Sequence, residues 1–330
     1  MRRGRDDHGP GRAQEGSGDE RPGAFHEPVL ADEVTRYLEP RGEGLYLDGT
    51  VGGGGHAQRL LQSCVRCRLL AVDRDPDALV EARRVLAPWR DRVRFLNATF
   101  DQATEDLEVK DRGLAGALLD LGVSSHQLDR PERGFTFERG IRLDMRMGGA
   151  EQEGPSAARF LSEAPEERLA QVFREYGEEP RARRLAREVV RRRGSGSMAT
   201  SDELVGALSA VLQRSPSNRE KARIFQALRI QVNQELTLLA RALPGLRDAL
   251  LGGAVLVVIA YHSLEDRLVK EAFREWSRSC VCPPELPVCV CRGRPLGETL
   301  TRRPLRPREE EVERNPRSRS ALLRAWRKAA

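Results

Sequence analysis

The chain has 330 residues, 39% of them hydrophobic and 5% aromatic, which is enough for one large core and an inserted smaller one. The formal net charge of +6 favours a polyanionic partner, and nucleic acid comes first among these. No apolar run approaches the roughly 20 residues that cross a bilayer, and the amino terminus lacks a signal-peptide core, so we expect a soluble, cytoplasmic protein without membrane contact.

Residues 1–24 are expected to form a disordered tail, because they combine Gly, Pro and mixed charge with almost nothing to bury. The acids Asp6, Asp7, Glu15, Asp19 and Glu20 argue against a mitochondrial transit peptide, which is nearly free of acidic residues.

The next hundred residues alternate between helical and strand periodicity. Helices are predicted at 28–38, 56–64 and 75–86, and strands at 45–49, 69–73, 93–97 and 115–122. This order is typical of an α/β fold with a doubly wound parallel sheet. Ligands of such sheets bind beyond the carboxyl ends of the strands, which draws attention to Asp48, Asp73, Phe100 and Asp120.

A glycine-rich loop follows the first predicted strand in LYLDGTVGGGGHAQRL. No Lys-Ser or Lys-Thr pair follows the glycines, so the loop is not a Walker phosphate loop. A dinucleotide site is disfavoured because Asp48 would lie close to the pyrophosphate. A ligand with one nucleoside and a cationic amino or sulfonium group fits better, since Asp73 can then take the ribose. S-adenosylmethionine has this profile.

Several strings in order resemble the bacterial 16S ribosomal RNA cytosine N4-methyltransferase family (MraW), over about Phe25 to Trp326. They are FHEPVLADEV, LDGTVGGGGH, AVDRDPDAL, LLDLGVSSHQLDRPERGFTF, RLDMRM, FQALRIQVNQEL and YHSLEDRLVK. Thr50 stands where the first motif of class I methyltransferases has its first glycine. The resemblance implies a class I methyltransferase fold and a set of residues that bind S-adenosylmethionine. These are Gly54, Gly55, His56, Asp73, Phe100, Asp120 and Gln127.

The same resemblance implies N4-methylation of a cytidine in the decoding region of 16S ribosomal RNA within the small subunit. We expect Asp120 or the loop from Gly122 to Ser125 to accept the amine, and Asp144 and His262 to contact the substrate. The loop lacks the aromatic residue that many amino methyltransferases place there. Phe135 and Phe137 are candidates for stacking on the base, within a lid predicted at 133–147.

The sheet pattern stops between residues 128 and 217, where helical periodicity and many arginines predict a helical insertion that binds the RNA substrate. The methyltransferase domain is therefore expected to be discontinuous, over 25–127 and 218–330. The run RRLAREVVRRR either contacts phosphate or is a solvated helix face.

The six cysteines fall into two groups. Cys64 and Cys67 lie on a predicted helix and at its exit, and are expected to be buried or reduced residues without a functional role. Cys280, Cys282, Cys289 and Cys291 form two Cys-x-Cys pairs, which either bind structural zinc or remain thiols in a Pro-rich loop. No metal is predicted in the active site.

Structural alternatives accompany each of these interpretations. The three aspartates are also suited to helix caps, Phe100 to the core, and His56 and His262 to structural roles. Two alternatives remain for the function. One is a noncatalytic RNA-binding assembly factor, and the other is a nicotinamide-dependent dehydrogenase, which the position of Asp48 disfavours. The sequence leaves the oligomeric state open.

Overall fold

A computed structural model describes residues 28–150, 152–282, 290–291 and 293–330. The tail predicted at 1–24 lies outside these residues. Within them, no helix combines the length and the apolar character that a membrane span requires.

A seven-stranded sheet forms the centre of the larger domain, in the order β3-β2-β1-β4-β5-β7-β6. The first five strands are parallel, and β7 runs antiparallel between β5 and β6. Their bounds are β1 Leu45–Asp48, β2 Arg68–Asp73, β3 Val93–Asn97, β4 Leu114–Asp120, β5 Leu250–Ala260, β6 Gly297–Thr299 and β7 Leu322–Lys328. The predicted doubly wound sheet is confirmed, and its strand order reverses between β1 and β4, where such folds bind ligands.

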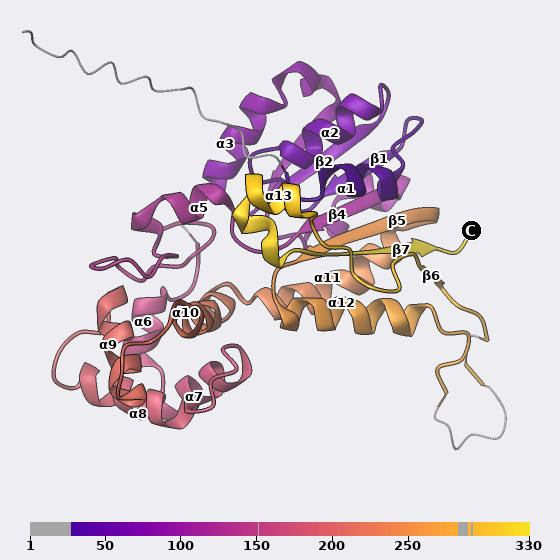
Figure 1. Cartoon of the computed structure of the whole chain (residues 1–330). Helices are drawn as coiled ribbons and strands as arrows, with labels where there is room; N and C mark the ends of the chain where they lie inside the picture. The colour runs from indigo at the N-terminus through magenta and orange to yellow at the C-terminus, as the bar shows by residue number, and fades with distance from the viewer. Residues whose placement is uncertain (1–27, 151, 283–289, 292) are drawn as a thin grey trace, which may run out of the picture.

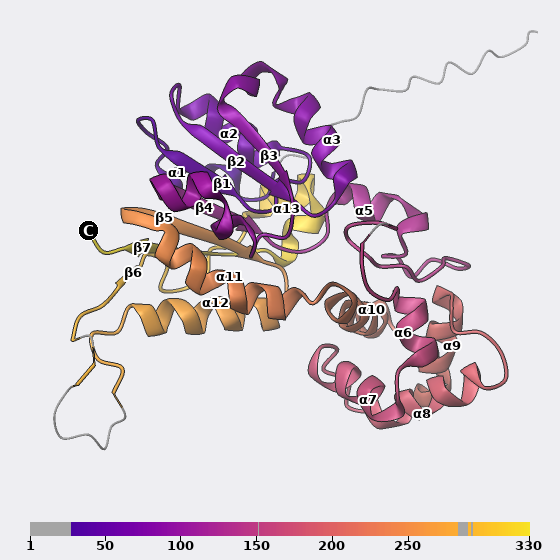
Figure 2. The same ribbon diagram turned by 180° about the vertical axis from the view of Figure 1, so that it is seen from behind.

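Helices cover both faces of this sheet (Figures 1 and 2). One face carries α1 (Ala31–Leu38), α2 (Gly55–Ser63) and α3 (Pro76–Val85), and the other carries α4 (Leu107–Arg112), α11 (Glu235–Ala249) and α12 (Ser263–Trp276). Successive strand residues point to opposite faces, so Tyr46 packs into the first layer and Leu47 into the second. Burial on both faces explains why the central strands β1, β2, β4 and β5 are largely apolar.

Short elements complete the larger domain. They are α5 (Ser125–Asp129), α13 (Glu309–Arg314) and the 3-10 helices Ala87–Arg92, Ala103–Glu105, Pro131–Arg133 and Pro316–Ser320. Glu311 of α13 accepts the N–H of Leu30 (2.8 Å), which fastens the carboxyl-terminal segment beside the start of α1.

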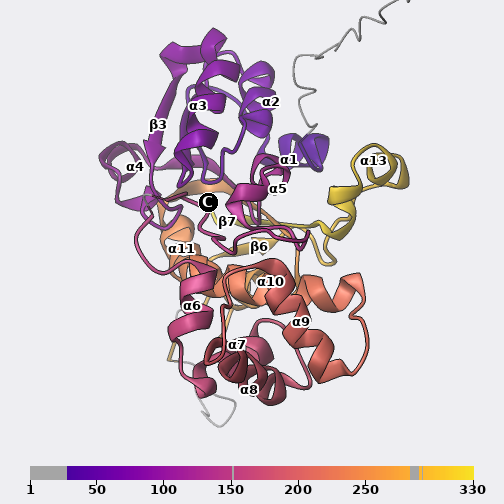
Figure 3. The same ribbon diagram turned by 90° about the vertical axis from the view of Figure 1, so that its left-hand side faces the viewer.

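The insertion is a separate helical domain at the active edge of the sheet (Figure 3). Its helices are α6 (Ala157–Glu163), α7 (Glu166–Glu175), α8 (Ala182–Arg193), α9 (Ser201–Leu212) and α10 (Asn218–Asn233), around a core of their own. Ile224, Phe225 and Leu228 of α10 belong to this core, although the sequence pattern assigned the helix to the methyltransferase domain. We therefore propose a boundary at Gln234, whose positive φ of 53° turns the chain from α10 into α11.

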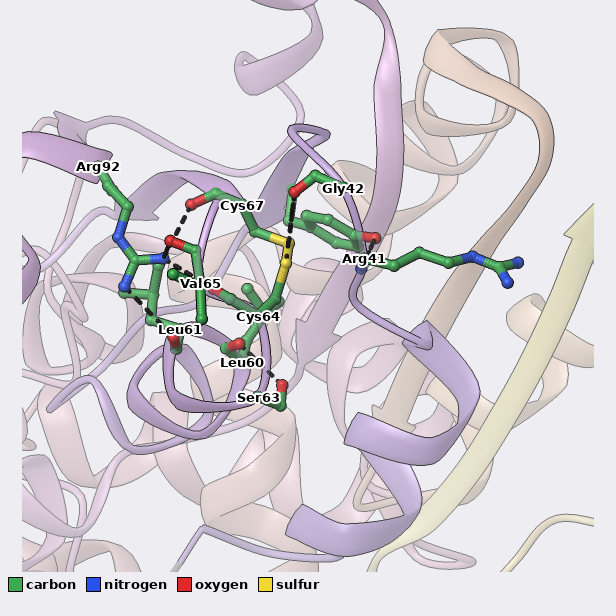
Figure 4. Close-up of a disulfide and its surroundings, with 10 residues drawn as sticks. Arg41, Gly42, Leu60, Leu61, Ser63, Cys64, Val65, Cys67 and Arg92 are labelled. Carbon is green, nitrogen blue, oxygen red and sulfur yellow. Dashed lines mark hydrogen bonds between the residues drawn. A yellow bond between two sulfur atoms is a disulfide. The ribbon is translucent and has the colours of Figure 1, made fainter.

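The first cysteine pair is buried, which was one of the two states expected. The two residues are not reduced, because they are joined in a disulfide (Figure 4). Cys64 ends α2 and Cys67 precedes β2, and the tight turn between these elements brings their Cα atoms to 5.6 Å. Arg92 donates to the carbonyls of Leu61, Cys64 and Val65, and so satisfies the end of the helix.

Candidate active site

A cavity of about 1170 Å³ opens at the carboxyl ends of the strands, between the sheet, α5, α10 and the carboxyl-terminal segment. Six of the predicted cofactor residues line it, namely Gly55, His56, Asp73, Phe100, Asp120 and Gln127. Gly54 does not line it. Its φ is +89°, and a Cβ there would meet Leu86 at 3.4 Å, so Gly54 serves the turn and its packing against α3.

The carboxylate of Asp48 lies beneath the glycine loop rather than on the cavity wall. It is buried and accepts the N–H of Thr50 (3.2 Å). Burial raises the pKa of Asp48 to about 7, although the charge of His56 and the Thr50 N–H act in the opposite direction. The Thr50 hydroxyl accepts the N–H of Asp120 (2.7 Å). Thr50, which stands where the methyltransferase motif has glycine, therefore connects the glycine loop to the end of β4.

Asp73 ends β2 at the rim of the cavity. Its two carboxylate oxygens accept the N–H groups of Gly52 (2.8 Å) and Asp75 (2.9 Å). Burial raises the pKa of Asp73 to about 6, and these two hydrogen bonds limit the rise. The carboxylate is thus oriented by the backbone, with acceptor capacity left for a ligand in the cavity.

Asp120 ends β4 in the middle of the cavity wall, between two side chains. The hydroxyl of Tyr261 donates to its Oδ1 (3.0 Å), and His56 Nε2 lies 3.5 Å from its Oδ2. Both ring nitrogens of His56 are buried without a hydrogen-bond partner among the described residues. Burial, with the charge of Asp120, raises the pKa of Tyr261 well above its usual value, so the hydroxyl keeps its proton as a donor.

Sequence analysis missed Tyr261, although its signal was available. It directly follows the apolar strand β5, which pairs with β4 so that Ile259 lies opposite Asp120. The residues after both strand ends therefore share one edge of the sheet.

His262, predicted to contact substrate, instead caps α12. Its Nδ1 accepts the N–H of Glu265 (3.3 Å), and Glu265 Oε2 accepts the N–H groups of Tyr261 (2.9 Å) and His262 (3.3 Å). His262 does not line the cavity, whereas Glu265 does.

The other predicted contact residues also lie off the cavity wall. Asp144 is held by Arg146 through two hydrogen bonds (2.9 and 2.7 Å), which outweigh burial and lower its pKa. Phe135 is buried in the helical core, and Phe137 packs edge-on against Phe225, so both stacking candidates belong to that core. The side chain of Ser125, at the start of α5, lies outside the described part of the chain.

Gln127 connects the sheet to the insertion. Its amide nitrogen donates to Asp75 Oδ2 (2.9 Å) and to the Met147 carbonyl (3.2 Å). Arg133, a residue of the predicted lid, donates to the same two acceptors, at 3.0 and 2.6 Å. Gln127 thus fixes the start of the insertion as well as lining the cavity.

An ion pair lies on the wall of the same cavity. Arg229 of α10 and Glu235 of α11 are joined by two hydrogen bonds (2.9 and 2.8 Å), and both line the cavity with Glu265. Glu265 is buried, but His262 and Arg229 outweigh this burial and lower its pKa. This half of the cavity therefore offers a buried cation and carboxylates to a polar ligand.

Glu235, His262 and Glu265 lie close enough together for a metal ion, since ligand atoms from all three fall within 4.8 Å of one another. The hydrogen bonds argue against one. Because His262 Nδ1 accepts an N–H, the proton of the neutral ring is on Nε2, which faces Glu265 Oε1 at 3.2 Å. Both oxygens of Glu235 accept from Arg229, so a metal at this carboxylate would compete with the ion pair.

The raised pKa of Asp48 predicts a pH-dependent stability. A carboxyl with a raised folded-state pKa stabilises the fold fully below its ordinary pKa of 3.8, and this contribution is lost as pH rises through about 7. Asp48→Asn should therefore raise the free energy of unfolding above that of the wild type. This gain should be about 2 kcal/mol larger at pH 8 than at pH 5. Denaturant unfolding at both values, with the exposed Asp91→Asn as control, measures the difference. A pH-independent effect of Asp48→Asn would contradict the assignment.

Comparison with known proteins adds to this geometry. The sequence profile of the MraW methylase family matches residues 23–329. A ribosomal RNA small subunit methyltransferase H of Gemmatimonas aurantiaca is 50% identical over 311 residues, covering 94% of this chain and 97% of the relative. The protein of that name from Heliobacterium modesticaldum is 46% identical over 311 residues, covering 92% and 98%. Among solved structures, a putative methyltransferase of Streptococcus mutans in complex with SAH has a TM-score of 0.41 at 10% identity, covering 90% and 94%.

Proposed function

Because the chain belongs to the MraW methylase family, we propose that it methylates N4 of a cytidine in the decoding region of 16S ribosomal RNA, within the small ribosomal subunit. As a member of the family, the chain is an S-adenosylmethionine-dependent ribosomal RNA methyltransferase with a class I fold. The cytosine N4 position, the decoding region and the residue roles below are parts of the proposal.

The central position of Asp120 is the observation that carries the proposal. Along the sheet, the glycine loop follows β1 and Asp73 ends β2 on one side of Asp120, whereas Tyr261 and Glu265 follow β5 on its other side, and all of them line one cavity with Arg229 and Glu235. A cavity with two chemically different halves and one carboxylate between them suits transfer between two bound molecules.

The first half fits S-adenosylmethionine, which supplies an electrophilic methyl group when it is bound. Gly52 and Gly53 carry no side chain along the cavity wall, and Asp73 presents a carboxylate held by two N–H groups for ribose hydroxyls. Asp48 adds negative charge beneath the loop when it is ionised, which favours a cationic ligand. The unpartnered nitrogens of buried His56 provide one further polar contact.

Asp120 is placed to orient the amine of the base. Tyr261 holds Oδ1, which leaves Oδ2 to accept one amine N–H. That hydrogen bond draws the amine toward tetrahedral geometry and turns its lone pair toward the methyl group. The amine loses a proton on methylation, and the same carboxylate is the nearest acceptor for it.

Arg229 is suited to donate hydrogen bonds to the edge of the pyrimidine ring that carries acceptor atoms. Cytosine presents O2 and N3 as acceptors beside its amine, and the guanidinium of Arg229 is a buried donor on that side of the cavity. A cytosine inside a duplex hides these atoms, so the enzyme must take an unpaired or flipped nucleotide.

The RNA is expected to approach from the insertion and the carboxyl-terminal segment. Asn315, Arg317 and Ser320 reach the rim of the cavity, and Arg317 pairs with Asp129 beside α5. The arginine-rich α8 lies on the side of the helical domain away from the sheet, so phosphate contacts there would be remote from the cavity (Figure 3).

Nucleoside analysis tests the reaction directly. The full chain is incubated with methyl-labelled S-adenosylmethionine and undermethylated small subunits, and the digested RNA is analysed by mass spectrometry. We expect label on cytosine N4 at one position of the decoding region. Label on cytosine C5, on a ribose hydroxyl or on protein would overturn the proposal while leaving the cofactor assignment intact.

Asp73→Ala should weaken binding of S-adenosylmethionine by about 1–3 kcal/mol, because a buried ligand hydroxyl would lose its acceptor. Asp73→Asn should weaken it less, since it keeps one acceptor oxygen for the loop N–H groups. Isothermal titration calorimetry measures both, with Asp91→Ala as an exposed control. Wild-type affinity in the folded Asp73→Ala variant would show that Asp73 does not bind the ligand.

A further inference from the structure

Three cysteine side chains gather at the base of the loop that joins α12 to β6. The Sγ atoms of Cys280, Cys282 and Cys291 all lie within 4.8 Å of one another. They come from two separate Cys-x-Cys pairs of the sequence, so the chain has folded back to bring them together.

The spacing of the sulfur atoms matches zinc rather than a disulfide. Cys280 Sγ and Cys291 Sγ lie 3.8 Å apart. A disulfide requires about 2.05 Å. Four thiolates at about 2.3 Å from a tetrahedral zinc ion are separated by about 3.8 Å along each edge of the tetrahedron. By contrast, Cys64 and Cys67 of the same chain are bonded to each other.

A backbone hydrogen bond supports the same arrangement. The N–H of Val281, between the two cysteines of the first pair, donates to Sγ of Cys291 in the second pair (3.3 Å). Backbone donors to metal-bound sulfur orient the ligands and stabilise their negative charge. The two pairs thus contact each other through both sulfur and backbone.

Most of the described residues of this loop are exposed beyond the point where its two ends meet. Its ends meet where the N–H of Leu296 donates to the carbonyl of Trp276 (2.8 Å), and Leu296 packs beneath the sheet. Beyond this closure, Cys280, Val281 and Val290 are exposed, and Cys282 and Cys291 are only partly buried. A segment without an apolar core is usually stabilised by a covalent or metal cross-link.

We propose that Cys280, Cys282 and Cys291 are ligands of a structural zinc ion that fixes this loop against the end of α12. The sequence places Cys289 in the second pair, but it lies outside the described residues, so the fourth ligand is unassigned. In Figure 1 the described residues that follow α12 lie at the end of this helix that points away from the helical domain. The site is therefore structural, and it stands independently of the proposed RNA reaction.

Metal analysis of the full chain, purified under reducing conditions without chelator, tests this inference. Mass spectrometry of metals should find about one zinc per chain in the wild type and close to none in Cys280→Ser/Cys282→Ser. The matched control, Cys64→Ser/Cys67→Ser, removes two cysteines elsewhere and should retain its zinc. Replacement by cobalt should give an intense thiolate-to-metal charge-transfer band in the wild type and the control only.

Two outcomes would overturn the proposal. One is a zinc-free wild type that also fails to take up zinc or cobalt after reduction. The other is full zinc content in Cys280→Ser/Cys282→Ser. Affinity for S-adenosylmethionine should be unchanged in that variant, which shows that loss of metal does not reflect global unfolding.

Discussion

Replacing Asp120 with asparagine is expected to lower kcat for methylation of small subunits by about 10²- to 10⁴-fold, the usual contribution of a positioned acid–base group. Asparagine has nearly the same shape as aspartate. The hydrogen bond from the Tyr261 hydroxyl and the one from the backbone N–H of residue 120 to the Thr50 hydroxyl can therefore both persist. It lacks the negative charge that orients the amine and receives its proton. The loss should therefore appear mainly in kcat under saturating methyl donor.

Two further variants separate this role from cofactor binding. Tyr261→Phe removes only the hydroxyl that holds Oδ1, so it should cost less than Asp120→Asn. Asp120→Ala also removes a wall of the cavity and should weaken S-adenosylmethionine as well. Single-turnover rates and calorimetric affinities distinguish the three. Turnover of Asp120→Asn within a few-fold of the wild type would rule out Asp120 as the acceptor.

The positions of Asp73 and Asp120 were predictable because each closes an apolar run, and the carboxyl ends of parallel strands meet at one edge. The part of the cavity formed by Arg229, Glu235 and Glu265 could not be predicted in this way. Arg229 and Glu235 lie on adjacent helices, and an amphipathic pattern does not reveal which core a helix joins. The boundary predicted at residue 218 rests on the same ambiguity.

Local chemistry explains two other differences. His262 follows a strand at the active edge, but its side chain is used by the N–H of Glu265 to begin α12, a choice that depends on backbone geometry. For Cys64 and Cys67, the short turn that brings their Cα atoms to 5.6 Å allows a disulfide, which a helical pattern alone does not indicate. His262 and the two cysteines lie beside the elements that the sequence predicts, and only their bonding partners differ.

Arg229→Met is expected to destabilise the fold by about 3–5 kcal/mol, the cost of leaving a buried carboxylate without its partner. The exposed fractions of the paired side chains are 14% for Arg229 and 9% for Glu235, and the charge of Glu265 also acts on Arg229. The pair joins α10 of the helical domain to α11 of the sheet domain. Its loss should therefore weaken the junction that Gln234 forms between them.

The chain contains a matched control in Arg241, which pairs with Asp101 at 2.7 Å but is 61% exposed. Arg241→Met should cost no more than about 1 kcal/mol, because solvent screens an exposed ion pair. Adding Glu235→Leu to Arg229→Met should recover part of the lost stability, since no unpaired carboxylate then remains at Glu235, whereas Glu265 keeps His262. Denaturant unfolding of the wild type and the three variants measures these differences. If Arg229→Met costs no more than Arg241→Met, the ion pair between Arg229 and Glu235 is not what holds the two domains together. The part of the cavity that is proposed to bind the base must then be rigid for another reason.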